Sequence, residues 1–140
     1  TGVDVSAADA VSAKNPDSVK SMAHIAGKLA QETGAVVMVT GEVDIIASPE
    51  NEIVYAIYNG SPNMAKVTGT GCMLTCITGT YLAVADALTA CVLAVVTLDC
   101  AGECANAVNG LGTYHIELID QLSLMDEAKI AQLANIQLLQ

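Results

Sequence analysis

Between Pro16 and Gly34 the apolar residues return every three or four positions, the spacing that places side chains on one face of a helix. Proline in a first turn and glycine just past a last turn are typical of helix ends. The stretch is therefore predicted to form an amphipathic helix. Its apolar face consists of Val19, Met22, Ala23, Ala26, Leu29 and Ala30.

The pattern changes at residue 35 from helical spacing to short continuous apolar runs. "AVVMVT", residues 35–40, is rich in valine and lacks polar alternation, so it predicts a parallel strand that is buried on both faces. "EVDIIA" and "EIVYAIYNG" flank the turn-like "SPEN", which indicates a hairpin over residues 42–60. We expect one more short strand in "NMAKVT", residues 63–68.

From Gly71 onward the chain has the pattern of apolar helices, which we place at about 71–85, 86–108, 113–123 and 126–134. Residues 81–98 approach the length of a membrane span, but Asp86 interrupts them and no lysine flanks them. We therefore expect two helices buried in a soluble protein, with no membrane partner.

These elements predict an α/β fold with few strands for so much apolar helix. Two parallel strands and a hairpin cannot cover three or four apolar helices. The chain is therefore expected to be part of a larger α/β sheet, either as a fragment or as a polypeptide that completes its core with another chain.

Composition narrows the possible ligands. Of the 140 residues, 53% are hydrophobic and 14% are charged, which excludes a disordered chain and allows one domain. The net charge is −10 and arginine is absent, which argues against nucleic-acid and anionic-lipid partners. Any bound phosphate must therefore be held by backbone N–H groups, a lysine, a metal ion or residues from another chain.

The five cysteines are odd in number, and we expect no signal peptide ahead of them, which favours free thiols in a reducing cytoplasm. Two pairs have i,i+4 spacing, Cys72–Cys76 and Cys100–Cys104, and could present four thiolates to zinc. Structural zinc sites usually use shorter spacings outside apolar helices, so this alternative is disfavoured. For Cys76, Cys91, Cys100 and Cys104 we expect packed, inert thiols.

"VTGTGC", residues 67–72, combines a glycine turn with the start of a helix. The first N–H groups of a helix have no intrahelical partner and carry partial positive charge, and glycines let a ligand approach the backbone closely. The turn is thus a candidate anion site, with an ordinary helix entry as the alternative. Cys72 lies where a helix N-terminus favours a thiolate, so it could serve as a base, a nucleophile or a metal ligand.

A second candidate site follows the first predicted strand. Thr40 ends that strand at its carboxyl edge, where open α/β sheets bind ligands, and its hydroxyl could hydrogen-bond a phosphate. Glu42 and Asp44 could touch a metal, although a solvated hairpin face is the expected role of both. Lys66 could offset phosphate charge or lie free on the surface. We expect His24 and His115 to be ordinary helix-face residues.

Three stretches together resemble the hydroxyethylthiazole kinase family, thiamine-salvage enzymes of the ribokinase-like superfamily. They are "VVMVTGEVDIIAS", "VYAIYNGSPNMAKVTGTGCMLTCITGTYLAV" and "GTYHIELIDQLS". The similarity runs from about Gly2 to Leu133, with "SPEN" as a small insertion in the hairpin. It implies that residues 1–140 form the C-terminal half of a single domain. That half is the helix-rich part, with a short hairpin, of a three-layer α/β/α sandwich.

The resemblance also implies an activity and residue roles. It implies transfer of the γ-phosphate of ATP, with Mg²⁺, to the primary hydroxyl of 4-methyl-5-(2-hydroxyethyl)thiazole. Thr40 matches a nucleotide-phosphate contact, and Gly69 matches a thiazole contact. Gly69, Thr70 and Gly71 correspond to the anion hole. Cys72 matches the proposed catalytic position, where most ribokinase-like enzymes place an aspartate as base.

The match covers only the C-terminal half of the family, whose members are typically trimers with sites at subunit boundaries. The other half would supply most of the sheet, a phosphate-binding arginine and the acids near magnesium, so the metal ligands stay unassigned. The chain alone is therefore expected to be inactive. Two alternatives remain beside the kinase: an inactive fragment or non-catalytic interaction domain, and a thiol redox protein.

Overall fold

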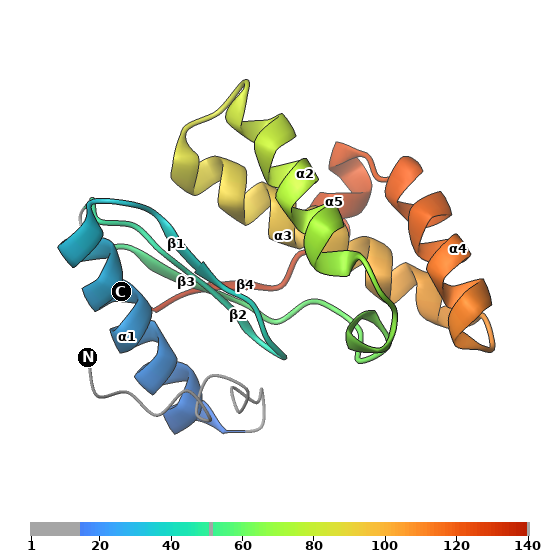
Figure 1. The fold of residues 1–140 in the computed structure, drawn as a ribbon, viewed down its shortest axis with the longest axis horizontal. Coiled ribbons are helices and arrows are strands. Elements are labelled where there is room, and N and C mark those ends of the chain that lie inside the picture. Colours follow the sequence, from blue (N-terminus) through green and yellow to red (C-terminus); the bar gives the residue numbers. More distant parts are fainter. Residues whose placement is uncertain (1–14, 51, 140) are drawn as a thin grey trace. The chain divides into compact units, whose positions relative to one another are not determined.

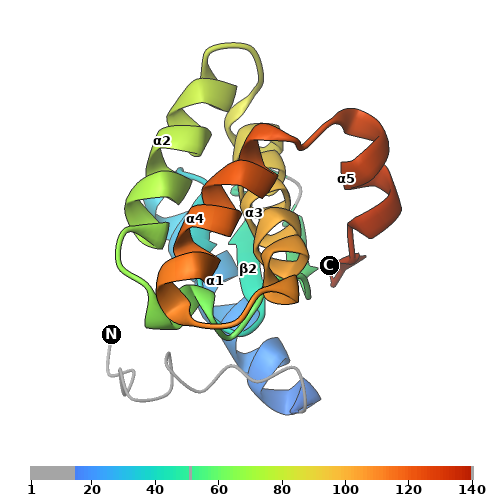
Figure 2. The same cartoon turned by 90° about the vertical axis from the view of Figure 1, so that its right-hand side faces the viewer.

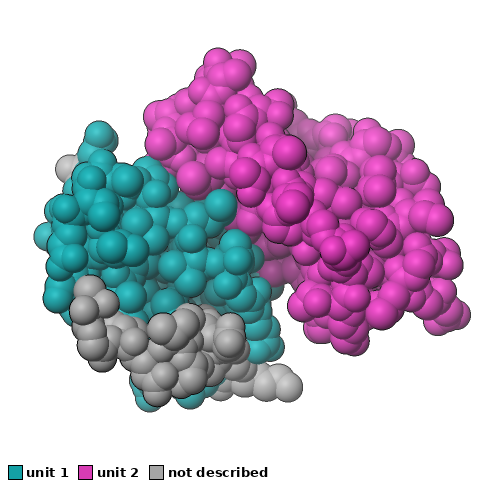
Figure 3. Space-filling view, in the orientation of Figure 1, with its two compact units in different colours: residues 1–58, 136–140 teal, residues 59–135 magenta. Residues whose placement is uncertain are grey.

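The computed structural model describes residues 15–50 and 52–139. The chain divides into two compact units, residues 1–58 with 136–140, and residues 59–135 (Figure 3). We refer to them as the first and the second unit. Helices and one β-sheet are both present, which confirms the predicted α/β class.

Among its described residues, the first unit contains helix α1 (Pro16–Thr33), which confirms the first helix predicted from the sequence. The side chain of Asn15 caps it by accepting hydrogen bonds from the backbone N–H groups of Asp17, at 3.1 Å, and Ser18, at 3.4 Å. Gly34 ends it in a left-handed conformation, with φ of +68°. Such an N-cap typically stabilises a helix by about 1 kcal/mol.

The sheet of the first unit has the order β1-β2-β3-β4 and is antiparallel throughout. Its strands are β1 (Val37–Val39), β2 (Asp44–Ala47), β3 (Val54–Ile57) and β4 (Ile136–Leu138). The β2–β3 pair confirms the predicted hairpin. Strand β4 was missed: it is three residues long, its side chains are exposed, and nothing in its sequence marks it as a strand.

Two strand predictions are wrong. Strand β1 pairs antiparallel with β2 and is only half-buried, because the four residues between them can reverse the chain but cannot form the crossover that a parallel pair needs. The segment predicted as a strand at 63–68 instead holds the 3₁₀ helix η2 (Met64–Lys66). Its turns are closed by hydrogen bonds from Met64 N to Ser61 O, at 2.9 Å, and from Lys66 N to Asn63 O, at 3.0 Å.

The core of the first unit lies between α1 and one face of the sheet (Figure 1). Helix α1 supplies the predicted apolar face except at Leu29, which is 43% exposed, and strands β2 and β3 supply alternate residues, as period-two strand geometry requires. The buried residues are Val19, Met22, Ala23, Ala26, Ala30, Val43, Ile45, Ala47, Val54 and Ala56.

The second unit is helical, and α3 lies at its centre. It comprises α2 (Thr70–Leu82), α3 (Ala87–Cys104), α4 (Leu111–Ser123) and α5 (Glu127–Leu133), with a short 3₁₀ helix η3 (Ala105–Ala107) after α3. Helices α2, α4 and α5 all contact α3 and lie around it (Figure 2). The four helices confirm the four that were predicted.

Asp86 separates α2 from α3, as expected from the charge within residues 81–98. Its carboxylate accepts a hydrogen bond from Thr89 N at 3.0 Å and thereby caps α3. The stretch Ala87–Ala107 is long and apolar enough to cross a membrane by length and composition, yet 61% of its most apolar window is buried inside the structure. This agrees with the expected burial for α3. It does not hold for α2, the other helix of the pair, which buries only Leu74 among the described residues.

A buried polar network holds the start of the second unit to its end. Asn59 is only 5% exposed, and its side-chain amide donates to Glu103 Oε1 at 3.2 Å and to Leu133 O at 2.9 Å. Its carbonyl oxygen accepts from Asn135 N at 2.6 Å. The carboxylate of Glu103 also accepts the backbone N–H of Gly60 at 3.0 Å. One amide therefore ties together the loop after β3, α3 and the chain after α5.

Replacing this amide should destabilise the protein. We expect Asn59→Ala to lower the free energy of unfolding by about 2–3 kcal/mol, because Glu103, Leu133 and Asn135 would each lose a buried partner. Equilibrium urea unfolding measures the loss. Asn63→Ala is the matched control, since its side-chain hydrogen bonds are solvent-exposed, and it should change the value by less than about 0.5 kcal/mol. Equal effects of the two variants would contradict the proposed importance of the network.

Candidate active site

The glycine turn, residues 69–72, forms the N-terminus of α2 in the second unit. Gly69 is the N-cap residue and has φ of +94°, a left-handed conformation that favours glycine, and it makes no side-chain cap. The first main-chain hydrogen bond of the helix runs from Met73 N to Gly69 O at 2.9 Å. The amides of Thr70, Gly71 and Cys72 therefore precede the first intrahelical bond, which is the arrangement of an anion site.

The surface around this turn is open. A Cβ atom added to Gly69 or to Gly71 would meet no heavy atom within 4 Å. Gly71 and Cys72 are exposed, and the first buried side chain of the helix is that of Leu74. The helix start and the thiol of Cys72 are therefore both accessible to a ligand.

The side chain and the backbone amide of Thr70 have different roles at the start of α2. Its hydroxyl donates a hydrogen bond to the carbonyl oxygen of Met64 at 3.3 Å. Thr70 can therefore contribute its backbone N–H to an anion, while its side chain ties the helix start to η2.

The five thiols differ in exposure. Cys72 and Cys76 are exposed, Cys104 is half-buried, and Cys91 and Cys100 are buried. The expectation of packed thiols holds for Cys91 and Cys100 but is wrong for Cys76, because α2 buries only Leu74 in this chain. Burial raises the pKa of Cys91. Burial, followed by the nearby carboxylates of Glu103 and Asp99, raises the pKa of Cys100 to about 12.

The zinc alternative finds no support in the described part of the chain. Residues 15–50 and 52–139 contain no group of three or more His, Cys, Asp or Glu side chains that could hold a metal ion. The spacing of the two cysteine pairs places one pair on α2 and the other at the end of α3.

Thr40 directly follows β1 in the first unit, and its side chain is exposed. Beyond it, the carboxylate of Asp44 accepts a hydrogen bond from Gly41 N at 2.8 Å and closes the turn into β2. Asp44 is 6% exposed, so the expected solvated role is wrong for this residue and holds only for Glu42. Thr40 and the glycine turn belong to different units, and each is described within its own.

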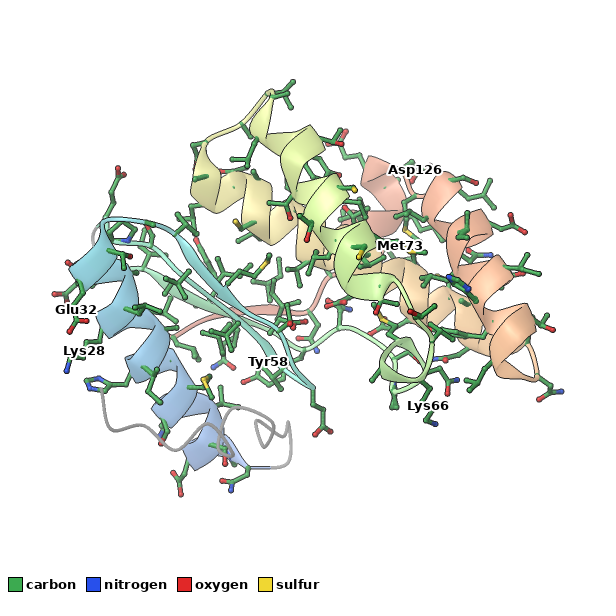
Figure 4. The ribbon with its side chains drawn as sticks, in the orientation of Figure 1. Lys28, Glu32, Tyr58, Lys66, Met73 and Asp126 are labelled. Atoms are coloured by element: carbon green, nitrogen blue, oxygen red, sulfur yellow. The ribbon has the colours of Figure 1, made fainter. Side chains whose placement is uncertain are left out.

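Three other candidates lie on the surface or along helices. Lys66 is exposed, its ammonium group donates to Asn63 Oδ1 at 3.2 Å, and its side chain extends outward from the turn (Figure 4). His24 is exposed on α1. His115 lies on α4, where its Nε2 is buried and has no hydrogen-bond partner among the described residues. Both histidines are helix-face residues, as expected.

The sequence reasoning missed the polar residues that hold the segment leading into the glycine turn. Asn59, Ser61 and Asn63 stand in "YNGSPN", which overlaps the end of the predicted hairpin and the start of the strand predicted at 63–68. Their partners Glu103 and Asn106 lie more than 40 residues away in the chain. The clustered Asn, Gly, Ser and Pro residues signal a turn, but no local pattern identifies partners at that distance.

Exposure predicts the order of thiol reactivity. With iodoacetamide at pH 7.5, Cys72 and Cys76 should be alkylated in the folded protein well before Cys91 and Cys100. A pKa of about 12 leaves fewer than about one Cys100 thiol in 10⁴ as the reactive thiolate at that pH. Peptide mass spectrometry at several times measures each rate, with the urea-unfolded chain as control. Fast labelling of Cys100 in the folded protein would contradict its burial.

This chain is similar in sequence to known proteins of one family. The sequence profile of the hydroxyethylthiazole kinase family matches residues 4–128. A hydroxyethylthiazole kinase 2 of Clostridium botulinum is 38% identical over 133 residues, which cover 94% of this chain and 48% of that protein. A hydroxyethylthiazole kinase of Pyrococcus furiosus is 37% identical over 110 residues, which cover 78% of this chain and 41% of that protein.

A solved structure of a hydroxyethylthiazole kinase protein from Pyrococcus horikoshii OT3 has a similar fold. It aligns with a TM-score of 0.81 and 32% sequence identity, over 86% of this chain and 47% of the other. The chain thus spans about half the length of the curated relatives that it matches.

Proposed function

This chain belongs to the hydroxyethylthiazole kinase family, and we propose that it contributes the phosphoryl-transfer half of such a kinase's active site. The reaction proposed is transfer of the γ-phosphoryl group of ATP to the primary hydroxyl of 4-methyl-5-(2-hydroxyethyl)thiazole, a step of thiamine salvage. The observation that carries the proposal is the open glycine turn, where three unpartnered helix amides stand beside the exposed thiol of Cys72.

In the proposed reaction the substrate oxygen forms a bond to the γ-phosphorus, and the bond from that phosphorus to the bridging oxygen of ATP breaks, releasing ADP. The thiolate of Cys72 accepts the proton of the hydroxyl. The backbone N–H groups of Thr70, Gly71 and Cys72 donate to the transferring phosphoryl oxygens, whose charge they stabilise. Gly69 leaves room for the thiazole beside them, since an added Cβ there meets nothing within 4 Å.

Thr40 is proposed to contact a phosphate of the nucleotide, for which its exposed hydroxyl at the end of β1 is suited. Mg²⁺ belongs to the proposal through the family, and it would neutralise phosphate charge when bound. The described residues offer no cluster of three candidate ligands, so we assign the metal no ligand in this chain. A homotrimer with shared sites and a cytoplasmic location are likewise proposed from the family.

Because the chain spans about half the length of its relatives, a second candidate is an inactive fragment or a non-catalytic interaction domain with the same fold. Isothermal titration of ATP–Mg²⁺ into a chimera separates the two candidates. In the chimera, this chain replaces the stretch of the Clostridium botulinum relative that it matches. Nucleotide binding and turnover support the kinase, and absence of both supports the second candidate.

The thiol can be tested by substitution in the same chimera. Cys72→Ser should lower kcat by about 10²-fold or more, because a hydroxyl is a far weaker base than a thiolate. Cys72→Asp should retain much more activity, since a carboxylate is also a base. Cys76→Ser, an exposed thiol one turn further along α2, is the control and should leave kcat unchanged. If Cys72→Ser matched the parent, Cys72 would have no catalytic role.

The role of the amides can be tested through Gly71. Its helical conformation accepts alanine, and an added Cβ meets nothing within 4 Å, so Gly71→Ala should fold normally. A methyl group at the open face of the turn should keep the phosphoryl group away from the amides and lower kcat by at least about 10-fold. Gly79→Ala, on the same helix and equally free of neighbours, is the matched control. Equal activity of both variants would argue against close approach at Gly71.

A further inference from the structure

The first turn of α2 is tied to the segment that precedes it. Gly69 provides no side-chain cap, and the hydroxyl of Thr70 instead donates to the carbonyl oxygen of Met64 at 3.3 Å. Met64 is the first residue of the 3₁₀ helix η2, and only three residues separate η2 from α2. The direction of the glycine turn therefore depends on where η2 lies.

The 59–66 segment is in turn fixed to the C-terminal end of α3 and to η3. Gly60 N donates to Glu103 Oε1 at 3.0 Å, and the hydroxyl of Ser61 donates to Asn106 Oδ1 at 2.6 Å. Ser61 Oγ also accepts from Asn63 N at 3.2 Å and holds the turn that begins η2. These contacts anchor the main chain on both sides of Pro62.

The side chain of Met64 sits over Gly102, in the last part of α3. A Cβ atom added to Gly102 would overlap Met64 Sδ and would lie 3.0 Å from Met64 Cγ and 3.2 Å from Tyr114 Oη. The Tyr114 hydroxyl donates to Gly102 O at 3.1 Å, and Tyr114 is almost fully buried. Glycine is less favourable than alanine inside a helix, and the Met64 side chain gives a physical reason for its presence here.

We propose that Gly102, through Met64 and Thr70, positions the glycine turn for phosphoryl transfer, an inference that rests on the proposed function. A methyl group at Gly102 would overlap Met64 Sδ and crowd Met64 Cγ, and the hydroxyl of the buried Tyr114 lies 3.2 Å from the same added atom, so the Met64 side chain must shift. The displacement moves the carbonyl that Thr70 bonds and shifts the amides of the turn. Donors that stabilise a transition state must lie within a narrow range of its oxygens, so a shift of about 1 Å costs as much as 10²-fold in rate.

The test is a double-substitution cycle in the chimera with the Clostridium botulinum relative: the parent, Gly102→Ala, Met64→Ala and the double variant. Gly102→Ala should lower kcat at least about 10-fold with KM for the thiazole within about 3-fold, because the amides act on the transition state. Met64→Ala removes both overlapping atoms but keeps the carbonyl group, so the double variant should recover to within about 3-fold of Met64→Ala. Gly79→Ala is the matched glycine control and should equal the parent.

Amide hydrogen exchange, measured in this chain alone, tests the positioning of the glycine turn without requiring catalytic activity. The Met73 amide, bonded to Gly69 O, should exchange faster in Gly102→Ala and return to the parent rate in the double variant. If the parent chimera transfers no phosphate, the proposed function fails while this arm still decides the positioning. An active chimera in which Gly102→Ala equals the parent overturns the positioning role. A loss that the double variant does not recover also overturns it, because the effect would not pass through Met64.

Discussion

The second unit depends on one buried amide. The side chain of Asn59 makes hydrogen bonds with groups 44, 74 and 76 residues further along the chain, and a single residue thereby closes the helical unit on itself. Leaving a buried polar group without these partners costs more folding free energy than the hydrogen bonds themselves contribute. Substitutions in such a network are therefore poorly tolerated. Gly60 and Ser61 extend the same network, so the segment that leads into the glycine turn begins from a fixed point.

Helix α3 is the other constraint. Its residues are buried on most sides, since α2, α4 and α5 all pack against it, and its apolar composition suits that position. Helix α2 has a similar composition but buries only Leu74 within this chain. The exposed first turn of α2 therefore belongs to a helix that packs within this chain mainly against α3. Through the contact of Gly102 with Met64, and of Met64 with Thr70, the buried helix α3 positions that turn.

Much of the candidate site could be predicted from the sequence, because its chemistry is local. Gly69, Gly71 and Cys72 stand together in six residues, and a helix start after a glycine turn presents its amides wherever it lies in a fold. The open surface around the turn was not predictable, since exposure depends on which elements cover it. The same limit explains the error at Cys76, an apolar-context thiol that proved exposed, and at Asp44, a hairpin carboxylate that proved buried.

The sequence by itself determined the helices, the hairpin and the glycine turn, because spacing, caps and turn residues act within a few positions of one another. Pro16 and Gly34 mark the ends of α1, and Asp86 divides α2 from α3 through local hydrogen bonds. The short connection between β1 and β2 already requires their antiparallel pairing. Only the tertiary structure decided the pairing of β4 and the partners of Asn59. Each of these depends on groups that only the folded chain brings together. Gly102 is a further example, because the reason for a glycine at this helix position is the Met64 side chain that lies over it.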